Sequence, residues 1–547
     1  MVVFPRVGAG WGRATGENLW LERIGPDDAG AVGAAGAAGR AGAYAVTSSW
    51  GMRWVLDSAG RVRRTSSGAG TAVVFSYDGA GRLERLTHEW GRAVQVRWDE
   101  AGARVAGLVA DDGRAVSYRY DGAGRLVKAA APGRVRRYEW EERGRIGRVV
   151  DADGVVEVSN AYDELGRVVA QRSPLGRTTR FAYLAGNVTQ TSDEDGSRSN
   201  TWIHDRRGRL IGVVDADGRR QSTTYDRWGN PVTVRERDGA LTVSAYDERG
   251  RLVVRRLPGG ARREWEWDES DRLVSVTVRP GASGGEDEPV AVTRYAYEGD
   301  ARTPSAVVDP AGGVTSLAWE GGLLRRITDP TGVGVEFGYD DHGDLVSSTN
   351  AAGDTARLER DGAGRVVAAV TPLGNRTVFD YDESTGLLTT RTDPTGARWR
   401  FEHTAAGRLS AVIDPYGART EIDHGEHGQE ERTVDPLGRA VRKGYDDLGN
   451  LARVELPDGT AWRFGYDALS RLVSFTDPTG AERTLTWGGD GLVSGAIDPT
   501  GAERRIERDA SGAPTRVVDG GDDVSARYDR AGRMVAVAGA DGAETVC

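Results

Sequence analysis

The stretch Tyr77-Asp78-Gly79-Ala80-Gly81-Arg82-Leu83 decides the fold, because the same phrase returns along most of the chain. It reappears as Tyr120-Asp121-Gly122-Ala123-Gly124-Arg125-Leu126 and as Tyr246-Asp247-Glu248-Arg249-Gly250-Arg251-Leu252. The shared pattern is an aromatic residue, an acid, two variable residues, Gly, Arg and an aliphatic residue. We name the aromatic position the anchor. An acid followed three residues later by Gly is typical of a tight turn, which we name the anchor turn.

The anchors recur about every 21 residues, with one interval of 30 residues between Trp267 and Tyr297. Twelve of the 17 tyrosines stand at anchors, which composition alone would not produce. The anchors predicted to be structural residues of the repeat are Tyr77, Trp98, Tyr120, Tyr162, Tyr225, Tyr246, Trp267, Tyr339, Tyr381, Tyr445, Tyr466 and Tyr528. Further copies have anchors at Trp140, Tyr183, His204, Tyr297, Trp319, Arg360, His403, His424, Trp487 and Arg508. The chain is therefore a repeat array.

A second kind of turn lies between successive anchors. The sequence Asp-Pro-x-Gly places its Gly seven residues before the next anchor. Pro fixes φ for the first turn position, Asp accepts hydrogen bonds from nearby backbone, and Gly closes the turn. We name this the second turn, and its Asp-Pro-x-Gly copies begin at Asp309, Asp329, Asp393, Asp414, Asp435, Asp477 and Asp498. Each unit thus holds two turns.

The segments between turns alternate with a period of two residues, as β-strands do. In Trp399-Arg400-Phe401-Glu402-His403 the apolar side chains would share one face and the charged ones the other. We expect an all-β array of about 23 β-hairpin repeats of about 21 residues each. A ribbon of about 46 strands has to coil, because twisted sheets rarely stay open beyond about ten strands. We therefore expect one continuous spiralling sheet, a partial hollow shell, in which the anchors stack ring on ring and each Arg lies near an anchor.

Two stretches break the rhythm of the repeat. Residues 1–50 include the Ala/Gly run from Ala29 to Ala45 and are expected to be a flexible leader or an incomplete preceding module. Residues 51–547 form the repeat array, and an exposed loop insertion at residues 280–289 accounts for the long interval.

Composition excludes several classes of protein. The chain has 72 Lys plus Arg against 82 Asp plus Glu, and a net charge of −10 does not suit a nucleic-acid-binding surface. The single cysteine, Cys547, rules out an internal disulfide and a cysteine-based zinc site. No stretch approaches 18 consecutive apolar residues and the N-terminus lacks a signal-peptide pattern, so neither a membrane span nor an export signal is expected. No cofactor is expected.

Three motifs could carry chemistry, and for each we favour a structural interpretation. Gly281-Ala282-Ser283-Gly284-Gly285 matches a nucleophile elbow, but it lies in the polar loop with no helix after it. His424-Gly425-Glu426-His427 looks like a metal pair, yet its first His is an anchor and a metal needs three or four ligands. Three Asp-x-Asp-Gly stretches resemble the start of a calcium loop, but they fall at hairpin turns, so turn formation is favoured over weak calcium binding; they begin at Asp151, Asp193 and Asp215. No catalytic or metal-binding residue is predicted.

The Tyr-Asp-x-x-Gly-Arg-Leu phrase at 21-residue spacing resembles the YD, or RHS, repeat family, from about Gly51 to the C-terminus. This family includes bacterial Rhs polymorphic toxins, the shell proteins of insecticidal toxin complexes and the animal teneurins. The resemblance implies a hollow β-shell, which in the bacterial members encloses a variable C-terminal toxin that is usually released by autoproteolysis near an Asp-Pro-x-Gly element. Here every Asp-Pro-x-Gly copy occupies a second turn and no variable domain follows. We therefore expect a repeat-core fragment, a truncated product or a partial shell without toxin activity.

Two functional hypotheses follow. The first is a non-enzymatic structural shell, or shell segment, that encapsulates or presents a toxin-type cargo polypeptide, with that cargo or further repeat segments as partners. The second is a cell-surface recognition module whose aromatic and Arg-rich outer face binds carbohydrate or a protein partner. The resemblance implies a secreted or cell-surface location, with the chain in the cytoplasm before export.

Overall fold

The computed structural model describes residues 3–7, 10–14, 17–25, 43–67, 71–193, 199–237, 239–258, 260–279, 290–467, 469–488, 491–508, 513–520, 522–528, 534–539 and 543–546. Throughout these ranges the regular elements are β-strands, so the expected all-β class is confirmed. No helix among the described residues could span a membrane. Some predicted features lie outside the described residues: the loop at 280–289 with its nucleophile-elbow motif, most of the Ala/Gly run, the Asp193 motif after its first residue, and Cys547.

The strands follow the chain in order. Those up to the long interval are β1 (Arg6–Val7), β2 (Gly10–Trp11), β3 (Leu19–Ile24), β4 (Ala43–Ser48), β5 (Arg53–Leu56), β6 (Val62–Ser66), β7 (Ala72–Tyr77), β8 (Leu83–His88), β9 (Ala93–Trp98), β10 (Val105–Ala110), β11 (Ala115–Tyr120), β12 (Leu126–Ala131), β13 (Arg134–Trp140), β14 (Ile146–Val150), β15 (Val156–Tyr162), β16 (Val168–Arg172), β17 (Thr178–Leu184), β18 (Val188–Ser192), β19 (Asn200–His204), β20 (Leu210–Val214), β21 (Arg220–Tyr225), β22 (Pro231–Arg235), β23 (Leu241–Tyr246), β24 (Leu252–Arg256), β25 (Arg262–Trp267) and β26 (Leu273–Arg279). Those after it are β27 (Ala291–Ala296), β28 (Ala306–Val308), β29 (Val314–Glu320), β30 (Leu323–Thr328), β31 (Gly334–Tyr339), β32 (Leu345–Thr349), β33 (Thr355–Arg360), β34 (Val366–Val370), β35 (Arg376–Tyr381), β36 (Leu388–Thr392), β37 (Arg398–His403), β38 (Leu409–Ile413), β39 (Arg419–His424), β40 (Glu430–Val434), β41 (Ala440–Tyr445), β42 (Leu451–Glu455), β43 (Ala461–Tyr466), β44 (Leu472–Thr476), β45 (Glu482–Trp487), β46 (Val493–Ile497), β47 (Glu503–Arg508), β48 (Pro514–Asp519), β49 (Asp522–Tyr528), β50 (Met534–Ala538) and β51 (Glu544–Val546).

One antiparallel sheet contains 49 of the described strands, from β3 to β51, in chain order. Each of these strands pairs with the next, while β1 and β2 pair only with each other. No pairing between described strands joins β51 to β3, so the sheet is an open ribbon. Since two strands make one unit, the anchor turns lie along one edge of the ribbon and the second turns along the other. We name these edges the lower rim and the upper rim.

The ribbon curves because each anchor lies at an irregularity of the strand ladder. The register shifts between Glu402 and His403, between Gly444 and Tyr445, and in the same way at most other anchors. A β-bulge bends its strand and increases the local twist. Repeated at nearly every unit, this distortion curves the ribbon in one direction.

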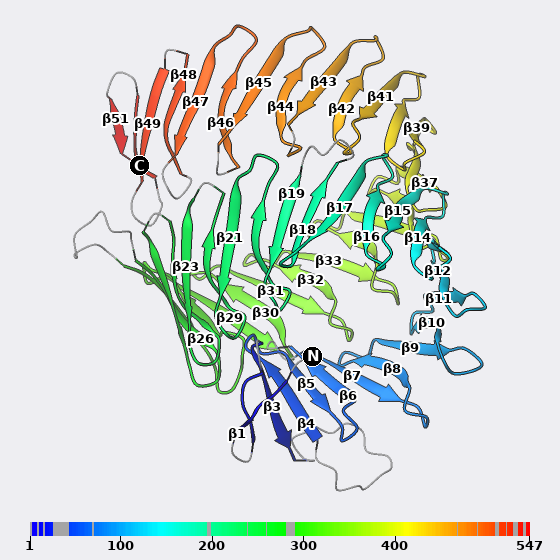
Figure 1. The fold of residues 1–547 in the computed structure, drawn as a ribbon, viewed down its shortest axis with the longest axis vertical. Coiled ribbons are helices and arrows are strands. Elements are labelled where there is room, and N and C mark those ends of the chain that lie inside the picture. The colour runs from blue at the N-terminus through cyan, green and yellow to red at the C-terminus, as the bar shows by residue number, and fades with distance from the viewer. Residues whose placement is uncertain are drawn as a thin grey trace.

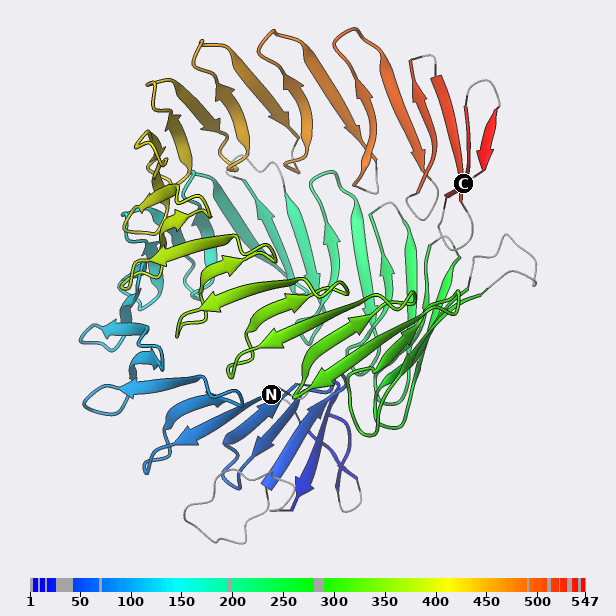
Figure 2. The same cartoon turned by 180° about the vertical axis from the view of Figure 1, so that it is seen from behind.

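The sheet coils into an open spiral, as expected (Figure 1). It rises from β3 through β9 to β14, crosses through β15 to β26, returns through β29 to β33, and crosses again through β41 to β51 (Figure 1; Figure 2 shows it from behind). From β21 onward the ribbon lies against its own beginning, where the side chain of Asn18 bonds that of Asn230. We therefore name β3 to β20 the first coil and β21 to β51 the second coil.

The solvent-exposed area shows that this spiral has no closed core. The chain exposes 31739 Å², whereas a compact protein of 58.6 kDa exposes about 19,000 Å². No large side chain among the described residues is fully buried, because a single-layer sheet has no second layer to cover either face. A buried apolar cluster of Ile24, Ala45 and Val55 lies in β3 to β5. The molecule is a curved wall rather than a packed body.

The two faces of this wall differ as the sequence alternation predicts. Phe401 lies opposite Val412 across β37 and β38, and both are half-buried. On the other face, the exposed Glu402 accepts hydrogen bonds from both terminal nitrogens of Arg419 at 2.8 Å. Cross-strand pairs of either kind contribute about 0.2–1 kcal/mol each. The stability of the wall is therefore a sum of many small neighbour contacts.

The sheet continues across residue 50, where the sequence suggested a boundary. Tyr44 in β4 lies opposite Leu56 in β5, and Thr47 lies opposite Arg53. β3 pairs with β4 along its whole length. Residues 19–24 and 43–48 are therefore strands of the same wall as the repeat array.

Candidate functional site

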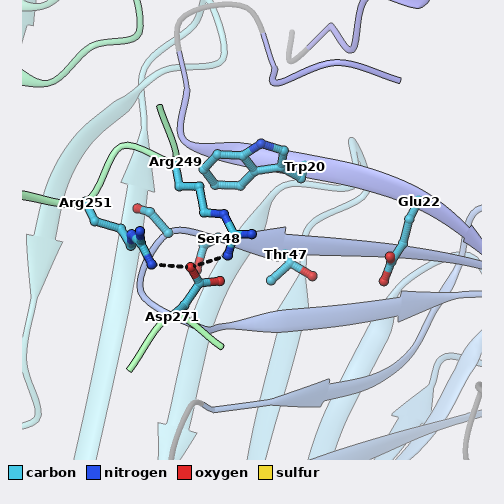
Figure 3. Close-up of a pocket in the computed structure, with 8 residues that line it drawn as sticks. Trp20, Glu22, Thr47, Ser48, Arg249, Arg251 and Asp271 are labelled. Atoms are coloured by element: carbon cyan, nitrogen blue, oxygen red, sulfur yellow. Dashed lines mark hydrogen bonds and ion pairs between the residues drawn. The ribbon is translucent and has the colours of Figure 1, made fainter. Parts of the chain in front are cut away.

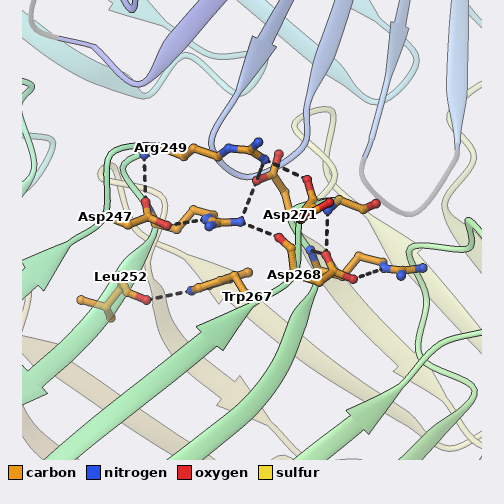
Figure 4. Close-up of polar contacts among 10 residues, drawn as sticks. Asp247, Arg249, Leu252, Trp267, Asp268 and Asp271 are labelled. Carbon is orange, nitrogen blue, oxygen red and sulfur yellow. Dashed lines mark hydrogen bonds and ion pairs between the residues drawn. The ribbon is translucent and has the colours of Figure 1, made fainter.

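The anchor turn is the unit from which every polar site in this protein is built, and the turn at Asp247 shows it (Figure 4). The Gly250 N–H donates to the Asp247 carbonyl at 2.9 Å. The Asp247 carboxylate accepts from the backbone N–H of Arg249 at 3.0 Å and of Arg251 at 2.8 Å, and from Nε of Arg251 at 2.6 Å. Gly250 has a φ of 74°, a left-handed conformation that other residues rarely adopt. The constant spacing of the repeated phrase is thus the spacing of one turn and its ion pair.

The arginine of each anchor turn also joins its unit to the next one. The guanidinium of Arg251 lies over the Trp267 ring, 5.7 Å from its centroid, and donates to the backbone carbonyl of Asp268 at 3.0 Å. In return, the Trp267 indole N–H donates to the Leu252 carbonyl at 2.9 Å (Figure 4). We name this set, an anchor-turn Asp and Arg with the next anchor, a clasp. Clasps link successive units along stretches of the lower rim, for example from Arg61 over Tyr77 to Arg125 over Trp140.

Ten of the predicted structural anchors bond back to the preceding unit as Trp267 does. A bond from the anchor's hydroxyl or indole N–H to a backbone carbonyl of the preceding unit, at 2.7–3.1 Å, is made by Tyr77, Trp98, Tyr120, Tyr162, Tyr225, Tyr246, Tyr339, Tyr381, Tyr445 and Tyr466. Tyr528 ends β49 and lies opposite Met534. Arg360 fills an anchor position with the same geometry, since its Nε donates to the Leu345 carbonyl at 3.0 Å.

The expectation that anchors stack ring on ring was wrong. The ring contacts among the described residues are Trp11 with Tyr44, His88 with Trp90, and Trp462 with Phe464, and no pair of successive anchors is among them. The physical reason is distance, because successive anchors lie two strands apart, about 9.6 Å at the usual strand spacing. The intervening arginine fills that gap and makes an alternating ladder of ring and guanidinium.

The clasps hold their carboxylates in the charged form. Hydrogen bonds from the backbone N–H of Arg82 and then from its guanidinium lower the pKa of Asp78 below its usual 3.8. Desolvation of the carboxylate opposes this shift without outweighing it. The same donors in their own turns lower the pKa of Asp121 and Asp163. In the turn at Asp382, hydrogen bonds from the Ser384 hydroxyl and then from Thr385 lower the pKa of the aspartate to about 2.

A second set of contacts joins the two coils, and we name it the seam. It forms where second turns on the upper rim of the first coil meet anchor turns on the lower rim of the second coil. Both terminal nitrogens of Arg92 bond the carboxylate of Asp344, 252 residues further along, which equals twelve units of 21. Asp344 stands where most units carry the clasp arginine. The Trp90 ring lies over Gly343 of the same turn, in the space that a Cβ would fill.

The Asp-x-Asp-Gly motifs also belong to the seam. The Asp153 carboxylate accepts from the Thr404 hydroxyl at 2.7 Å and the Ala406 N–H at 2.9 Å, and Arg408 bonds both Asp151 and Asp153. Arg471 lies 3.6 Å from the carboxylate of Asp217, in the motif that begins at Asp215. These acids are thus engaged by donors of the protein itself. Within the described ranges, no three His, Cys, Asp or Glu side chains are grouped to hold a metal ion.

A pocket of about 280 Å³ lies where the seam begins (Figure 3). Trp20 and Thr47 of the hairpin β3–β4 line it on one side. Arg249 and Arg251 line it on the other and both donate to the Asp271 carboxylate at 2.8 Å. Two arginines of one anchor turn therefore converge on an acid of the next anchor turn, beside strands β3 and β4.

The remaining candidate, His424, ends β39 at an anchor position and lies opposite Glu430. His427 follows in the turn, with its Nε2 3.2 Å from the Glu426 carboxylate. The two histidines thus occupy separate positions of an anchor turn.

Sequence reasoning missed the seam. The signals available for it were the acid Asp344 in an arginine position and the second acid of the Asp-x-Asp-Gly motifs.

Comparison with known proteins agrees with this geometry. A family model described as Teneurin YD-shell matches residues 47–259. A model described as RHS Repeat matches residues 246–283, 319–355, 339–377, 381–419 and 445–482. This chain is built from YD, or RHS, repeats.

YD-repeat relatives among characterised proteins are bacterial toxins. The chain is 36% identical over 110 residues to Toxin protein Tse5 of Pseudomonas aeruginosa, a stretch of 19% of this chain and 8% of the relative. It is 36% identical over 87 residues to Double-stranded DNA deaminase toxin A of Burkholderia cenocepacia, a stretch of 16% of this chain and 6% of the relative. The matched YD repeats span less than a tenth of either relative.

Solved structures show the same YD-repeat fold. The crystal structure of TcdB2-TccC3 superposes with a TM-score of 0.53 at 14% identity, covering 91% of this chain and 38% of that one. The TcdB2-TccC3-TEV structure gives the same TM-score and identity, with 90% of this chain and 39% of that chain covered. The fold of this chain therefore recurs within these structures at low sequence identity.

The clasp predicts local rather than global destabilisation of the YD-repeat array. The substitution Asp247→Ala removes the acceptor of two backbone N–H groups and of Arg251, which should cost about 1–3 kcal/mol. Because each unit contacts only its neighbours, amide hydrogen exchange should accelerate in β23 to β26 and stay unchanged in β41 to β44. Glu248→Ala, an exposed change in the same turn, is the matched control. Faster exchange along the whole chain would contradict this prediction.

The seam predicts coupling between distant residues. The single substitutions Arg92→Asp and Asp344→Arg should each lower the thermal unfolding temperature, because each sets like charges against one another. The double variant should recover most of the loss, with a coupling energy of about 0.5–3 kcal/mol in a double-mutant cycle. Additive losses in the double variant would show that the two coils do not meet at this pair.

The lowered pKa values predict the acid limit of stability. A carboxyl whose folded pKa is depressed stabilises the protein fully above its unfolded pKa, and that stability is lost as the pH falls through the folded pKa. The unfolding temperature should therefore be nearly constant from about pH 7 to pH 5 and fall between about pH 4 and pH 2, as measured by circular dichroism. A decline that is complete above about pH 5 would point to other groups.

Proposed function

We propose that this chain is a non-enzymatic segment of a YD-repeat shell that coils round a polypeptide cargo and encapsulates or presents it. The observation that carries the proposal is the exposed area of 31739 Å², far above that of a compact protein of this mass. A wall one sheet thick that winds through two stacked coils exposes far more surface than a compact protein of the same mass. Such a form is useful when the space it encircles is the functional part.

The arrangement of the polar residues supports a structural role. Clasp side chains such as Asp247 and Arg251 bond each other, and Asp151, Asp153 and Asp217 are engaged by arginines across the seam. The activities that appear in the names of the toxin relatives belong to proteins of which the matched stretches are less than a tenth. The proposal for this chain is therefore a container, with the toxin-type polypeptide as its cargo.

The clasps also argue against carbohydrate binding by the anchors. One face of each clasped ring is covered by a guanidinium, for example Tyr183 by Arg167 with 4.4 Å between the guanidinium carbon and the ring centroid. A sugar would need that flat face for stacking. The rows of anchor aromatics serve the wall itself, which favours the shell over a glycan-recognition module.

A protection assay tests the shell proposal. An unstructured passenger with a site for a sequence-specific protease would be joined after Val546, and the same passenger would be joined to a compact carrier protein. We expect cleavage to be about tenfold slower on the shell, because a passenger encircled by the coils is less accessible to the protease. Equal cleavage rates on the two carriers would overturn the proposal.

A seam variant provides the matched control for this assay. Asp153→Ala combined with Arg408→Ala removes contacts between coils and should restore fast cleavage while the circular dichroism spectrum stays that of a β-sheet. Asp458→Ala changes an acid at the same second-turn position on the upper rim of the second coil, where its partner is Thr460 of its own turn. This variant should protect the passenger as well as the unmodified chain does.

A further inference from the structure

A second pocket lies between the two coils, beside β12 and β13. Its volume is about 380 Å³, within the range of about 300–1,000 Å³ that small-molecule sites occupy. Val116, Ala129 and Ala131 of the first coil line it, and Ala406 and Arg408 of the second coil complete the lining. The pocket therefore belongs to both coils, and we name it the seam pocket.

The small side chains of β12 produce the hollow. Ala129 holds the cross-strand position that Leu108 and Val149 hold in the hairpins on either side. Ala131, at the end of the same strand and opposite Arg134, is a second small side chain in the lining. The space that larger side chains fill in the neighbouring units is thus left open here.

The coils touch directly beside this pocket. The carbonyl oxygen of Gly133 lies 3.2 Å from the point where a Cβ on Gly407 would stand. The Cβ of Thr385 lies 3.3 Å from the corresponding point on Gly133. Gly133 precedes Arg134 of the lining, and Gly407 stands between two lining residues of the second coil. A separation of the coils would therefore open the pocket.

The charges in the seam pocket are not balanced, because three arginines and two acids line it. Arg136 is paired with Glu157 at 2.8 Å, and Arg408 is paired with Asp151. Arg134 is exposed and has no hydrogen bond or ion pair to any residue that the structure describes. One positive charge, on a side chain with five N–H donors, is therefore available to a ligand.

A carboxylate on a short apolar stem fits these features. A guanidinium donates two parallel hydrogen bonds to a carboxylate, and such charge-assisted bonds are about twice as strong as neutral ones. One negative charge matches the one unpaired cation, whereas a phosphate group carries about −1.5 to −2 at neutral pH and would need further cations. The apolar lining of alanine and valine side chains suits the stem.

We propose that the seam pocket binds a carboxylate group, with Arg134 as its ion-pair partner and Ala129 and Ala131 in contact with its stem. The carboxylate belongs either to an acidic side chain of a polypeptide or to a free small acid, since both present the same chemistry. Because residues of both coils form the site, an occupant stabilises the closed seam by mass action. The site is independent of the shell proposal, and only a cargo side chain as its occupant rests on that proposal.

Calorimetric titration of the full chain, with no cargo present, tests the ligand class. We expect saturable binding of 4-methylpentanoate and at least tenfold weaker binding of 4-methylpentanamide, which has the same shape without the charge. The peptide acetyl-Ala-Glu-Ala-amide, compared with its Gln counterpart, tests an acidic side chain as the source. Tighter binding of the Glu peptide than of 4-methylpentanoate identifies a polypeptide as the source of the carboxylate, and the reverse identifies a free acid.

Three variants locate the binding. Arg134→Gln should weaken binding about tenfold or more, because it removes the one unpaired cation. Ala131→Leu fills the hollow and should weaken binding to a similar extent, with the circular dichroism spectrum of the sheet unchanged. Arg180→Gln changes an exposed arginine that does not line the pocket, and should leave the dissociation constant as it is.

Hydrogen exchange tests whether the occupant holds the coils together. The Ala406 N–H donates to the Asp153 carboxylate across the seam at 2.9 Å, so its exchange reports on opening of the seam. With 4-methylpentanoate at ten times its dissociation constant, exchange at Ala406 should slow about tenfold. Exchange in β43 and β44, which do not line the pocket, should stay unchanged.

Several results would overturn the proposal. They are equal binding of 4-methylpentanoate and its amide, undiminished binding in the Arg134→Gln variant, tighter binding of inorganic phosphate than of the carboxylates, and unchanged exchange at Ala406 in the presence of ligand. Failure of both 4-methylpentanoate and the Glu peptide to bind would also overturn it.

Discussion

The rest of this structure depends on one interaction, the clasp of an aspartate, an arginine and the next anchor. A sheet one layer thick has no second layer to bury its side chains, so it cannot be held by a core. The clasp supplies the missing constraint. Its aspartate closes the turn, its arginine covers the next anchor ring, and that anchor bonds back to the preceding unit, as Asp247, Arg251 and Trp267 show. Each hairpin is thereby fixed to its neighbour in one geometry.

Identical joints between units produce a constant curvature, and constant curvature produces the coil. The register shift at most anchors bends every hairpin in the same sense. After about 252 residues the ribbon returns to its own edge, and turns that had only closed hairpins acquire contacts with another coil. The upper rims of the two coils differ in sequence. The Asp-Pro-x-Gly turns all begin at or after Asp309, whereas the covered turns of the first coil carry Trp90, Asp153, Leu175 or Asp217 at the third position.

Contacts between neighbouring units connect the architecture of this chain to its proposed function. Because each unit depends on its neighbours along the ribbon and across the seam, the wall can enclose space without a core. The fold recurs at 14% identity in the TcdB2-TccC3 structure. The charged residues of a clasp, such as Asp247 and Arg251, hold neighbouring hairpins together.

The sequence by itself determined the repeat, the all-β class, the two turns of each unit and the two faces of the sheet, because turn formation and strand alternation are local properties. It also placed anchors such as Tyr77 and Tyr466 at positions where the side chain bonds a carbonyl of the preceding unit. Only the tertiary structure decided what lies against each anchor and each turn. Rings alternate with arginines because successive anchors are two strands apart, and Arg92 meets Asp344 because accumulated curvature, a property of the whole ribbon, brings them together. No local pattern encodes this accumulated curvature, so the seam could be seen only once the ribbon had coiled.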